Sequence, residues 1–599
     1  MEITFKRILV FALSFALSLS ASVFAQHATE FPAQHATITL LETSDIHGTI
    51  APWDYATDSP NDCGLEKVAT IVKEQRKLDP NLILIDCGDN VQDNLIQEFR
   101  NQRIHPMVAA LNSLSYDMHV LGNHEFNFEF KNLQKNIKRF KAPVITANIY
   151  KKNGKRFLNP YLIKEVNGVK IALIGVTAPH VERWEASNPE HFNNMKFTEV
   201  EDEIGKLLNE IGDKADVVLV VAHNGEDGEY GSKGMGEIAE IFVDKIPVYF
   251  LGHAHSVLNK TTDSGVLLVE PGSKGSYVAK VVLDFENLDG KWILTNKKGE
   301  LLKIKGENIP VDEEMAKLNA KTHEKSREIA NSVIGTVNDD FLPSLWWNDL
   351  QGIPTAVVQD TAMIDLINKV QMETTGADVS LAALFDSESN LTKGDFKQRD
   401  SVKIYKYDNT LMSVKISGAQ LKQIMELQAG NFFNQSKDGD ITISFDPNIR
   451  LYMYDMFAGV DYEIDISKPK GSRIKNVMYK GEPLKDDEVL VLALNNYRYG
   501  GLTSSGIISS STSPDVLVYN TGVAIRDKIS EYVKNKKIIS PECDNNWKIV
   551  GFDYDNPQAQ KVYDLVRSGK IKIETSADGR TPNTASLNVY ELQRQGLLN

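Results

Sequence analysis

Residues 36–45 read ATITLLETSD, an apolar run of strand length that ends in polar side chains. Four later stretches share this character, because they are rich in Val, Ile or Leu and end in glycine or polar residues. They are NLILIDCGD (81–89), VKIALIGVTAP (169–179), ADVVLVVAHNG (215–225) and IPVYFLGHAH (246–255). Amphipathic helical patterns lie between several of them, as at 65–78 and 200–212. The alternation predicts a layered α/β domain with buried sheets.

Side chains that bind metals follow the predicted strands. A single polar residue after a strand is usually a turn residue, but here such residues follow one strand after another. Because the carboxyl ends of strands in an open α/β sheet line one crevice, these side chains should converge. The spacing of Asp45 with His47, and of His253 with His255, places each pair on one side of an extended chain. The seven candidate ligands are Asp45, His47, Asp89, Asn123, His223, His253 and His255.

The mixture of ligand types indicates the kind of metal. Imidazole, carboxylate and amide groups together suit Zn, Mn, Fe or Co better than Ca. We therefore expect a transition-metal site in the first domain.

The first 25 residues have the pattern of a secretory leader. Lys6 and Arg7 precede the apolar run 8–19, and Val23 and Ala25 occupy the small positions before a cleavage point. We therefore expect a protein exported to the periplasm or the medium. A membrane anchor is the alternative, but the apolar run is shorter than the roughly 20 residues that a spanning helix needs.

The composition limits the classes of partner. A formal net charge of -15 produces a surface that repels a phosphate backbone, so we do not expect long nucleic acid as a partner. A small anion held by metals remains compatible with that charge. Three cysteines exclude a disulfide-rich scaffold. Cys63 and Cys87 could form a disulfide, although sequence alone does not show whether they are within reach. We expect a monomer without a stable membrane anchor.

The second half of the chain predicts another domain. Residues 311–335 form a charged helical pattern with few turn signals, typical of a connecting helix. We place this linker at 301–334, between a catalytic domain at 26–300 and a second domain at 335–540. The second domain has a helical pattern at 360–373 and strand patterns at 410–417 and 487–497. The tail at 541–599 receives no role.

Five motifs resemble the successive blocks of the two-metal calcineurin-like phosphoesterases: SDIHG, DCGDN, GNHEFN, AHNG and GHAH. The resemblance implies a four-layer αββα domain with two divalent cations, Zn, Mn, Co or Fe. Two cations about 3.5 to 4 Å apart polarise a phosphoryl group and activate a water for in-line attack. It implies that one cation takes Asp45, His47 and His255 and the other Asn123, His223 and His253, with Asp89 as the bridge.

The same resemblance gives His124 a catalytic role. His124 follows the ligand Asn123, and in similar enzymes this histidine meets the phosphate or the leaving oxygen. A histidine that only holds the loop is the alternative. Glu125 has no ligand role in the family pattern, and we interpret it as structural.

The second domain is similar to the carboxy-terminal domain of the exported 5'-nucleotidase family. The similar stretches are 359–386, 402–428, 461–474 and 492–501, and they are most similar to the 2',3'-cyclic-nucleotide 2'-phosphodiesterase/3'-nucleotidase branch. The resemblance implies an α+β nucleotide-binding domain in which Tyr407 and Tyr497 sandwich the base, with Asn409 as a further substrate contact. Stacking is tolerant of base identity, so we expect broad use of nucleotides. The alternative is that both tyrosines are packing residues.

Two departures from the 5'-nucleotidase pattern favour this branch. The stretch AALFDSES (382–389) lacks the arginine of the G-G-I-R block that holds phosphate in 5'-nucleotidases. Asn127 stands where those enzymes have an aspartate, so we include it with His124 as a catalytic residue. An aspartate could stabilise the imidazolium form of His124, whereas an amide can only orient the ring.

The expected function is hydrolysis of 2',3'-cyclic nucleotides to 3'-nucleotides, and then to nucleoside and phosphate. A 5'-nucleotidase or UDP-sugar hydrolase of the same architecture is the nearest alternative. A catalytically inactive nucleotide-binding or adhesion protein is the alternative from another class.

Overall fold

The computed structural model describes residues 34–185, 189–229, 231–342, 350, 352–385, 389–407, 409–509, 513, 515–576 and 581–598. The leader predicted at residues 1–25 lies outside these ranges. None of the helices in the described ranges combines the length and the hydropathy that a membrane span requires.

The first unit contains two six-stranded sheets. In the first sheet, β1, β4, β5 and β6 run parallel, and β15 and β16 extend it in antiparallel fashion. The order along this sheet is β16 (Lys291–Lys303), β15 (Tyr277–Leu288), β1 (Gln34–Thr43), β4 (Ile83–Asp86), β5 (Met118–Val120) and β6 (Val144–Ile145).

The second sheet has a parallel centre with one antiparallel strand at each edge. Its order is β13 (Val257–Thr261), β14 (Leu267–Pro271), β12 (Val248–Leu251), β11 (Val217–His223), β9 (Val169–Thr177) and β8 (Tyr161–Val166). The five strands predicted from apolar runs are thus β1, β4, β9, β11 and β12.

Alternating side chains on single strands explain why the sheets stack. On β12, Val248 and Phe250 belong to the core between the two sheets, whereas Tyr249 and Leu251 pack beneath helices. Because successive side chains of a strand point to opposite faces, a continuous apolar run buries both faces of its sheet.

Helices cover the outer face of each sheet. On the first sheet they are α2 (Leu65–Leu78), α3 (Pro106–Ser113) and the start of α9 (Glu313–Asn331), and on the second α7 (Val200–Ile211) and α8 (Met235–Ile241). The order helix, sheet, sheet, helix confirms the predicted four-layer αββα architecture.

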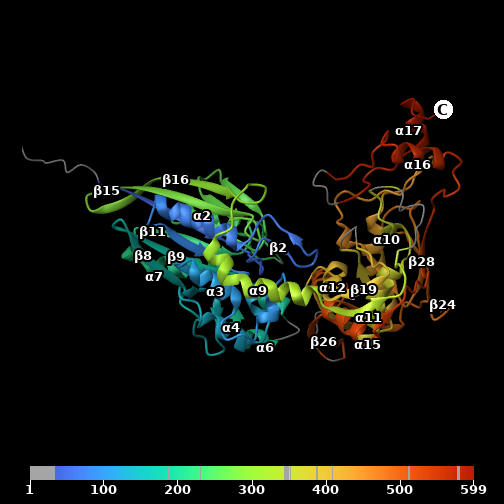
Figure 1. The fold of residues 1–599 in the computed structure, drawn as a ribbon, viewed down its shortest axis with the longest axis horizontal. Helices are drawn as coiled ribbons and strands as arrows, with labels where there is room; N and C mark the ends of the chain where they lie inside the picture. Colours follow the sequence, from blue (N-terminus) through green and yellow to red (C-terminus); the bar gives the residue numbers. More distant parts are fainter. Residues whose placement is uncertain are drawn as a thin grey trace, which may run out of the picture.

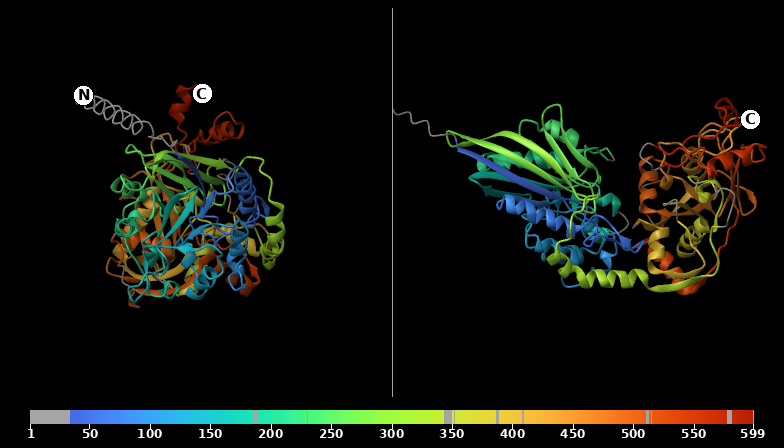
Figure 2. Two further views of the ribbon diagram at one scale, coloured as in Figure 1. Left: turned by 90° about the vertical axis from the view of Figure 1, so that its left-hand side faces the viewer. Right: turned by 45° about the horizontal axis from the view of Figure 1, so that its top comes forward.

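The helix α9 runs from the first unit to the second (Figures 1 and 2). Its N-cap, Asp312, accepts a hydrogen bond from the backbone N–H of Met315, and this end is joined to α2 by Lys73. Near its other end Arg327 pairs with Asp58, which also pairs with Arg399 of the second unit. The connecting helix predicted from its charge pattern is therefore anchored to the first unit by ion pairs.

The second unit is built around a mixed five-stranded sheet. Its order is β21 (Asp455–Ala458), β18 (Val379–Ala383), β25 (Val489–Asn495), β20 (Thr410–Ser417) and β26 (Leu517–Ala524). Its helices include α11 (Ala362–Thr375), α12 (Gln398–Ile404), α13 (Gly418–Met425), α14 (Asn496–Ser504) and α15 (Ile525–Lys536). This mixture of strands and helices agrees with the α+β class expected for the second domain.

The polar tail packs against this second unit. The strand β28 (Trp547–Val550) lies parallel to β22 (Asp461–Asp465). Val562 of α16 (Ala559–Arg567) and Leu592 of α17 (Val589–Arg594) belong to the hydrophobic core of the second unit, together with residues of β22 and β28. The tail therefore contributes to the fold of the second unit.

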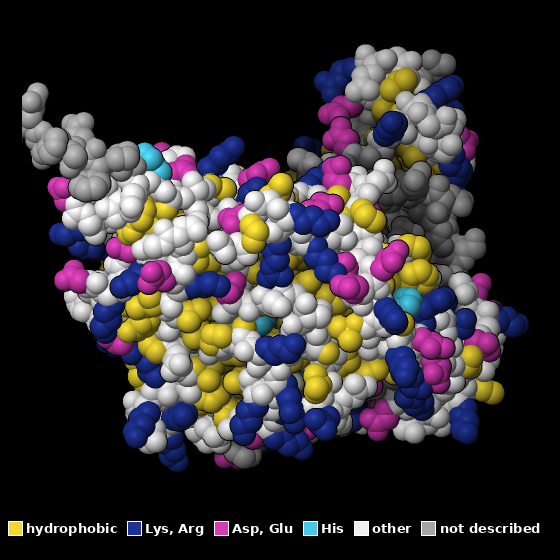
Figure 3. Space-filling view, turned by 60° about the vertical axis from the view of Figure 1, so that its left-hand side comes forward, with side chains coloured by type: hydrophobic (Ala, Val, Ile, Leu, Met, Phe, Trp, Pro, Cys, Tyr) yellow, Lys and Arg dark blue, Asp and Glu magenta, His cyan; other side chains and the backbone are white. Residues whose placement is uncertain are grey.

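The surface carries charges of both signs. On the face shown in Figure 3, Lys and Arg side chains alternate with Asp and Glu, and apolar side chains appear between them.

Cys63 and Cys87, which could have formed a disulfide, are both buried free thiols.

Candidate metal centre and substrate pocket

The fold brings the seven candidate ligands together at one edge of the two sheets. Asp45 follows β1, Asp89 follows β4 and Asn123 follows β5, all in the first sheet. In the second sheet His223 is the last residue of β11, and His253 and His255 follow β12. The convergence expected at the carboxyl ends of parallel strands is therefore present in the structure.

One group of ligand atoms comprises Asp45, His47 and His255. The Nε2 atoms of the two histidines are 3.0 Å apart. Oδ1 of Asp45 lies 3.3 Å from Nε2 of His255 and 3.8 Å from Nε2 of His47. Three ligand atoms thus face one point, as a bound cation requires.

The second group comprises Asp89, Asn123, His223 and His253. Oδ1 of Asn123 lies 3.0 Å from Nε2 of His223 and 2.9 Å from Nδ1 of His253. Oδ2 of Asp89 lies 3.0 Å from Nε2 of His223. These short distances between acceptors and ring nitrogens again suit a shared cation, in agreement with the borderline ligand set.

The backbone is strained at most of these positions. Asp45, His47, Asp89, His253 and His255 all have positive φ, between 45° and 78°. A residue other than glycine in this region costs about 1 to 3 kcal/mol and persists only where its surroundings demand it. The strain falls on five of the seven candidate ligands, which supports a functional origin.

Glycines leave room for the ligands. A Cβ at Gly122 would overlap the carboxylate of Asp89, and one at Gly252 would overlap Ser44 and Asp45. The glycine that opens the segment GNHEFN is therefore required by the approach of Asp89 from the neighbouring loop.

The pKa values of the candidate ligands are shifted by burial and by their charged neighbours. Burial alone would raise the pKa of Asp89, but the charges of His223 and His124 and a hydrogen bond from His223 hold it well below its usual range. Burial opposes the charged form of His223, yet Asp89 raises the pKa of His223 to about 10. Burial lowers the pKa of His47 to about 4, which favours the neutral, metal-binding form. A metal ion would take the place of the proton between Asp89 and His223.

Glu125 braces the loops that carry Asp89 and Asn123. Its Oε2 accepts hydrogen bonds from the backbone N–H groups of Asp89 and Gly122, and its Oε1 accepts one from Asn90. Burial and then the charge of Asp89 raise the pKa of Glu125 to about 7. These contacts agree with the structural interpretation of this residue.

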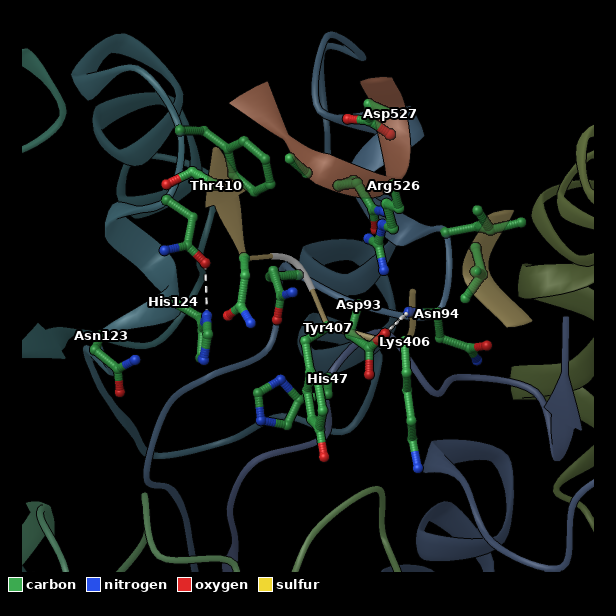
Figure 4. Close-up of a pocket in the computed structure, with 18 of the residues that line it drawn as sticks. His47, Asp93, Asn94, Asn123, His124, Lys406, Tyr407, Thr410, Arg526 and Asp527 are labelled. Atoms are coloured by element: carbon green, nitrogen blue, oxygen red, sulfur yellow. Dashed lines mark hydrogen bonds between the residues drawn. The ribbon is translucent and has the colours of Figure 1, made fainter. Parts of the chain in front are cut away.

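His124 sits at the edge of the centre with its ring held by Asn127. Its Nε2 lies 4.0 Å from Oδ2 of Asp89, and its side chain is 33% exposed. Its Nδ1 lies 2.6 Å from Oδ1 of Asn127, the contact marked at His124 in Figure 4. Nδ2 of Asn127 donates to Oε1 of Glu185 at 2.7 Å. Sequence reasoning missed Glu185, because nothing near it in the chain marks it.

A cavity of about 1250 Å³ opens between the metal centre and the second unit. His47 and His124 line it on one side, and Tyr407, Asn409 and Tyr497 on the other. The two tyrosines are 41% and 54% exposed. The structure thus places all three predicted substrate contacts in one cavity with the metal centre, as Figure 4 shows for Tyr407 and His47.

Basic side chains that sequence reasoning missed also line this cavity. Arg526, the second residue of α15, reaches from the second unit toward Asp93 and Asn94 (Figure 4). Burial would raise the pKa of Asp93, but Lys274, whose Nζ lies 3.0 Å away, and then Arg526 lower it. The stretch around Arg526 has no local motif, so only the fold reveals its position.

Comparison with known protein families agrees with this geometry. Residues 38–257 match the family model described as calcineurin-like phosphoesterase, and residues 333–506 match the 5'-nucleotidase C-terminal domain. The chain carries a calcineurin-like phosphoesterase domain followed by a 5'-nucleotidase carboxy-terminal domain. Both resemblances found in the sequence motifs are confirmed. The phosphoesterase family implies divalent metal ions, and the nucleotidase family implies nucleotide substrates.

Relatives match most of this chain at low identity. The 2',3'-cyclic-nucleotide 2'-phosphodiesterase/3'-nucleotidase of Yersinia enterocolitica is 28% identical over 90% of this chain and 92% of its own length. The trifunctional nucleotide phosphoesterase protein YfkN of Bacillus subtilis is 27% identical over 92% of this chain. This chain spans only 42% of that relative.

A solved structure supports the fold. A Staphylococcus aureus protein described as a 5'-nucleotidase superposes with a TM-score of 0.72 over 86% of this chain and 100% of its own, at 24% identity. At that identity the likeness concerns the fold alone.

Loss of the Glu125 carboxylate should weaken metal binding, because it accepts hydrogen bonds from the loops of Asp89 and Asn123. In Glu125→Gln one carboxylate oxygen becomes an NH₂ group that faces backbone N–H donors, so the loops of Asp89 and Asn123 should loosen. We expect metal affinity to fall by about 10- to 100-fold, the usual cost of losing a group that supports metal ligands. Metal content after dialysis against buffered zinc measures the affinity. The control is Glu129→Gln, because Glu129 makes none of the hydrogen bonds to these loops that Glu125 makes. Equal metal retention in both variants would contradict the bracing role.

Proposed function

We propose that the chain is an exported, metal-dependent phosphoesterase that hydrolyses 2',3'-cyclic nucleotides to 3'-nucleotides, and then to nucleoside and phosphate. The observation that carries the proposal is the shared cavity, in which a cluster of metal ligands faces Tyr407 and Tyr497. The Yersinia relative with this activity in its name covers nearly the whole chain. The departures at residues 382–389 and at Asn127 favour the same branch.

We assign the metal centre two divalent cations, Zn, Mn, Co or Fe. Asp45, His47 and His255 would hold the first, and Asn123, His223 and His253 would hold the second. Asp89 joins the two sets, because it lies 3.0 Å from His223 and interacts electrostatically with His47. Bound cations of this kind polarise the phosphoryl group, activate a water and support the leaving oxygen.

The side chains of the protein supply position and specificity. His124 faces the cavity from beside the second ligand set and is assigned the contact with the phosphate or leaving oxygen. Tyr407 and Tyr497 offer π faces to the base, and Asn409 is a further contact to the nucleoside. The leader at residues 1–25 supports export, and we expect a monomer that acts on small nucleotides.

The substrate is tested by four parallel assays, with 2',3'-cyclic AMP, 3'-AMP, 5'-AMP and UDP-glucose. We expect the cyclic and 3' substrates to have the highest kcat/KM. Preference for 5'-AMP or UDP-glucose would replace the proposal by the 5'-nucleotidase alternative. A metal-free native preparation without activity on any of the four would favour the binding-protein alternative.

Replacement of Asp89 should be the most damaging single change in the centre. Asp89→Ala removes the carboxylate between the two ligand sets and leaves two cations repelling each other. We expect activity to fall by at least about 1000-fold, the range seen when a principal electrostatic stabiliser is lost. Activity near wild type with metal supplied would refute the site.

The tyrosines should affect activity according to the substrate. Tyr407→Ala or Tyr497→Ala should weaken use of nucleotides by roughly 5- to 150-fold, because each ring contributes about 1 to 3 kcal/mol of stacking. Hydrolysis of bis(p-nitrophenyl) phosphate should change little, and the Phe variants should retain most activity. Equal loss on both substrates would mean that these residues support the fold instead.

A further inference from the structure

Asn127 is one member of a chain of hydrogen bonds that leads away from the metal centre. Its Oδ1 faces Nδ1 of His124 at 2.6 Å, and its Nδ2 faces Oε1 of Glu185 at 2.7 Å. The other oxygen of Glu185, Oε2, faces Nδ1 of His191 at 2.9 Å. Glu185 is 93% buried, since its exposed fraction is 7%. Both of its carboxylate oxygens are therefore engaged in hydrogen bonds, and the network that they form is partly buried.

The chemistry of these groups determines which way the amide points. An ionised carboxylate only accepts hydrogen bonds, so Glu185 can pair with the NH₂ group of Asn127 but not with its oxygen. The oxygen of Asn127 must then face His124. An oxygen opposite Nδ1 requires a hydrogen on Nδ1.

The amide orientation in turn determines the state of the imidazole. With its hydrogen on Nδ1, neutral His124 presents an unprotonated Nε2 toward the cavity. A doubly protonated ring keeps the same hydrogen bond to Asn127. A flipped amide would set its N–H against a ring N–H in that form, so it would exclude a charged His124.

We propose that Glu185 is a positioning residue that fixes the tautomer of His124 through the amide of Asn127. The negative charge that an aspartate at position 127 would place beside the imidazole is instead located one side chain farther away, on Glu185. His191 holds Glu185 in place by its hydrogen bond to the second oxygen. This inference rests on the proposed function only in assigning His124 a contact with the substrate.

The first test removes the carboxylate that fixes the orientation of the Asn127 amide. In Glu185→Gln the new amide can offer either its oxygen or its NH₂ to Asn127, so the orientation of Asn127 is no longer imposed. We expect kcat on bis(p-nitrophenyl) phosphate to fall by about 10- to 100-fold, with KM little changed. The control is Glu182→Gln, the same change three residues earlier in the chain, at a side chain that accepts from the backbone N–H of Phe197. It should behave like wild type.

The second test exchanges the two groups. Asn127→Asp alone sets two carboxylates against each other at the 2.7 Å contact and should lose activity. The double variant Asn127→Asp/Glu185→Gln restores a donor and an acceptor, because the glutamine NH₂ can donate to the aspartate, which still accepts from Nδ1–H of His124. We expect the double variant to exceed Asn127→Asp by roughly tenfold or more, since contacting residues are coupled. No gain over Asn127→Asp would overturn the proposal.

The third test observes the tautomer without any substrate. Spectra of ¹⁵N-labelled histidine in the full-length, zinc-loaded protein should show the hydrogen of His124 on Nδ1 in wild type and Glu182→Gln. Glu185→Gln should show a mixture of tautomers. A hydrogen on Nε2 in wild type would overturn the proposal even if Glu185→Gln fails to fold. Failure of every nucleotide assay would remove the proposed function but leave this tautomer assignment standing.

Discussion

The metal centre depends on sharp reversals of the chain directly after buried strands. Asp45, His47, Asp89, His253 and His255 can point toward common sites only because their backbone adopts positive φ. Such conformations are unfavourable for these residues, so packing elsewhere must offset their cost. The two sheets meet through a continuous apolar core, and this rigid base holds the strained loops in place. Glu125 adds a second restraint, because its carboxylate joins the loop of Asp89 to the loop of Asn123 through backbone N–H groups.

Metal ions at the first unit can recognise only the phosphoryl group of a substrate. Cations that contact a phosphoryl group do not distinguish the nucleoside attached to it, so selectivity must come from other surfaces. The second unit places Tyr407, Asn409 and Tyr497 in the cavity that His47 and His124 also line, and we propose that these three residues supply that selectivity. It also supplies Arg526, whose charge acts on Asp93 of the first unit. The cavity is therefore composed by both units, and its shape depends on how they contact each other.

The segment around α5 (Val181–Trp184) contacts both the candidate metal centre and the second unit. Arg183 donates a hydrogen bond to the backbone oxygen of Gly500 in α14, the helix that carries Tyr497. The ring of Trp184 lies 5.1 Å from that of His253, and Glu185 holds Asn127. One short segment thus contacts a candidate metal ligand, the support of His124 and the second unit.

The sequence by itself determined the layered α/β class, the principal strands and helices of the first domain, and the seven candidate ligands. These were accessible because apolar periodicity reflects local geometry, and because Asp45, Asp89 and the histidines follow strands in a repeated order. Only the tertiary structure decided that Glu185 and His191 support Asn127, that Arg526 reaches the cavity, and that the tail after Cys543 packs into the second core. Most of these contacts join residues far apart in the chain, as Glu185 and Asn127 do at a separation of 58 positions. No local pattern encodes them, because their partners are chosen by the packing of whole elements.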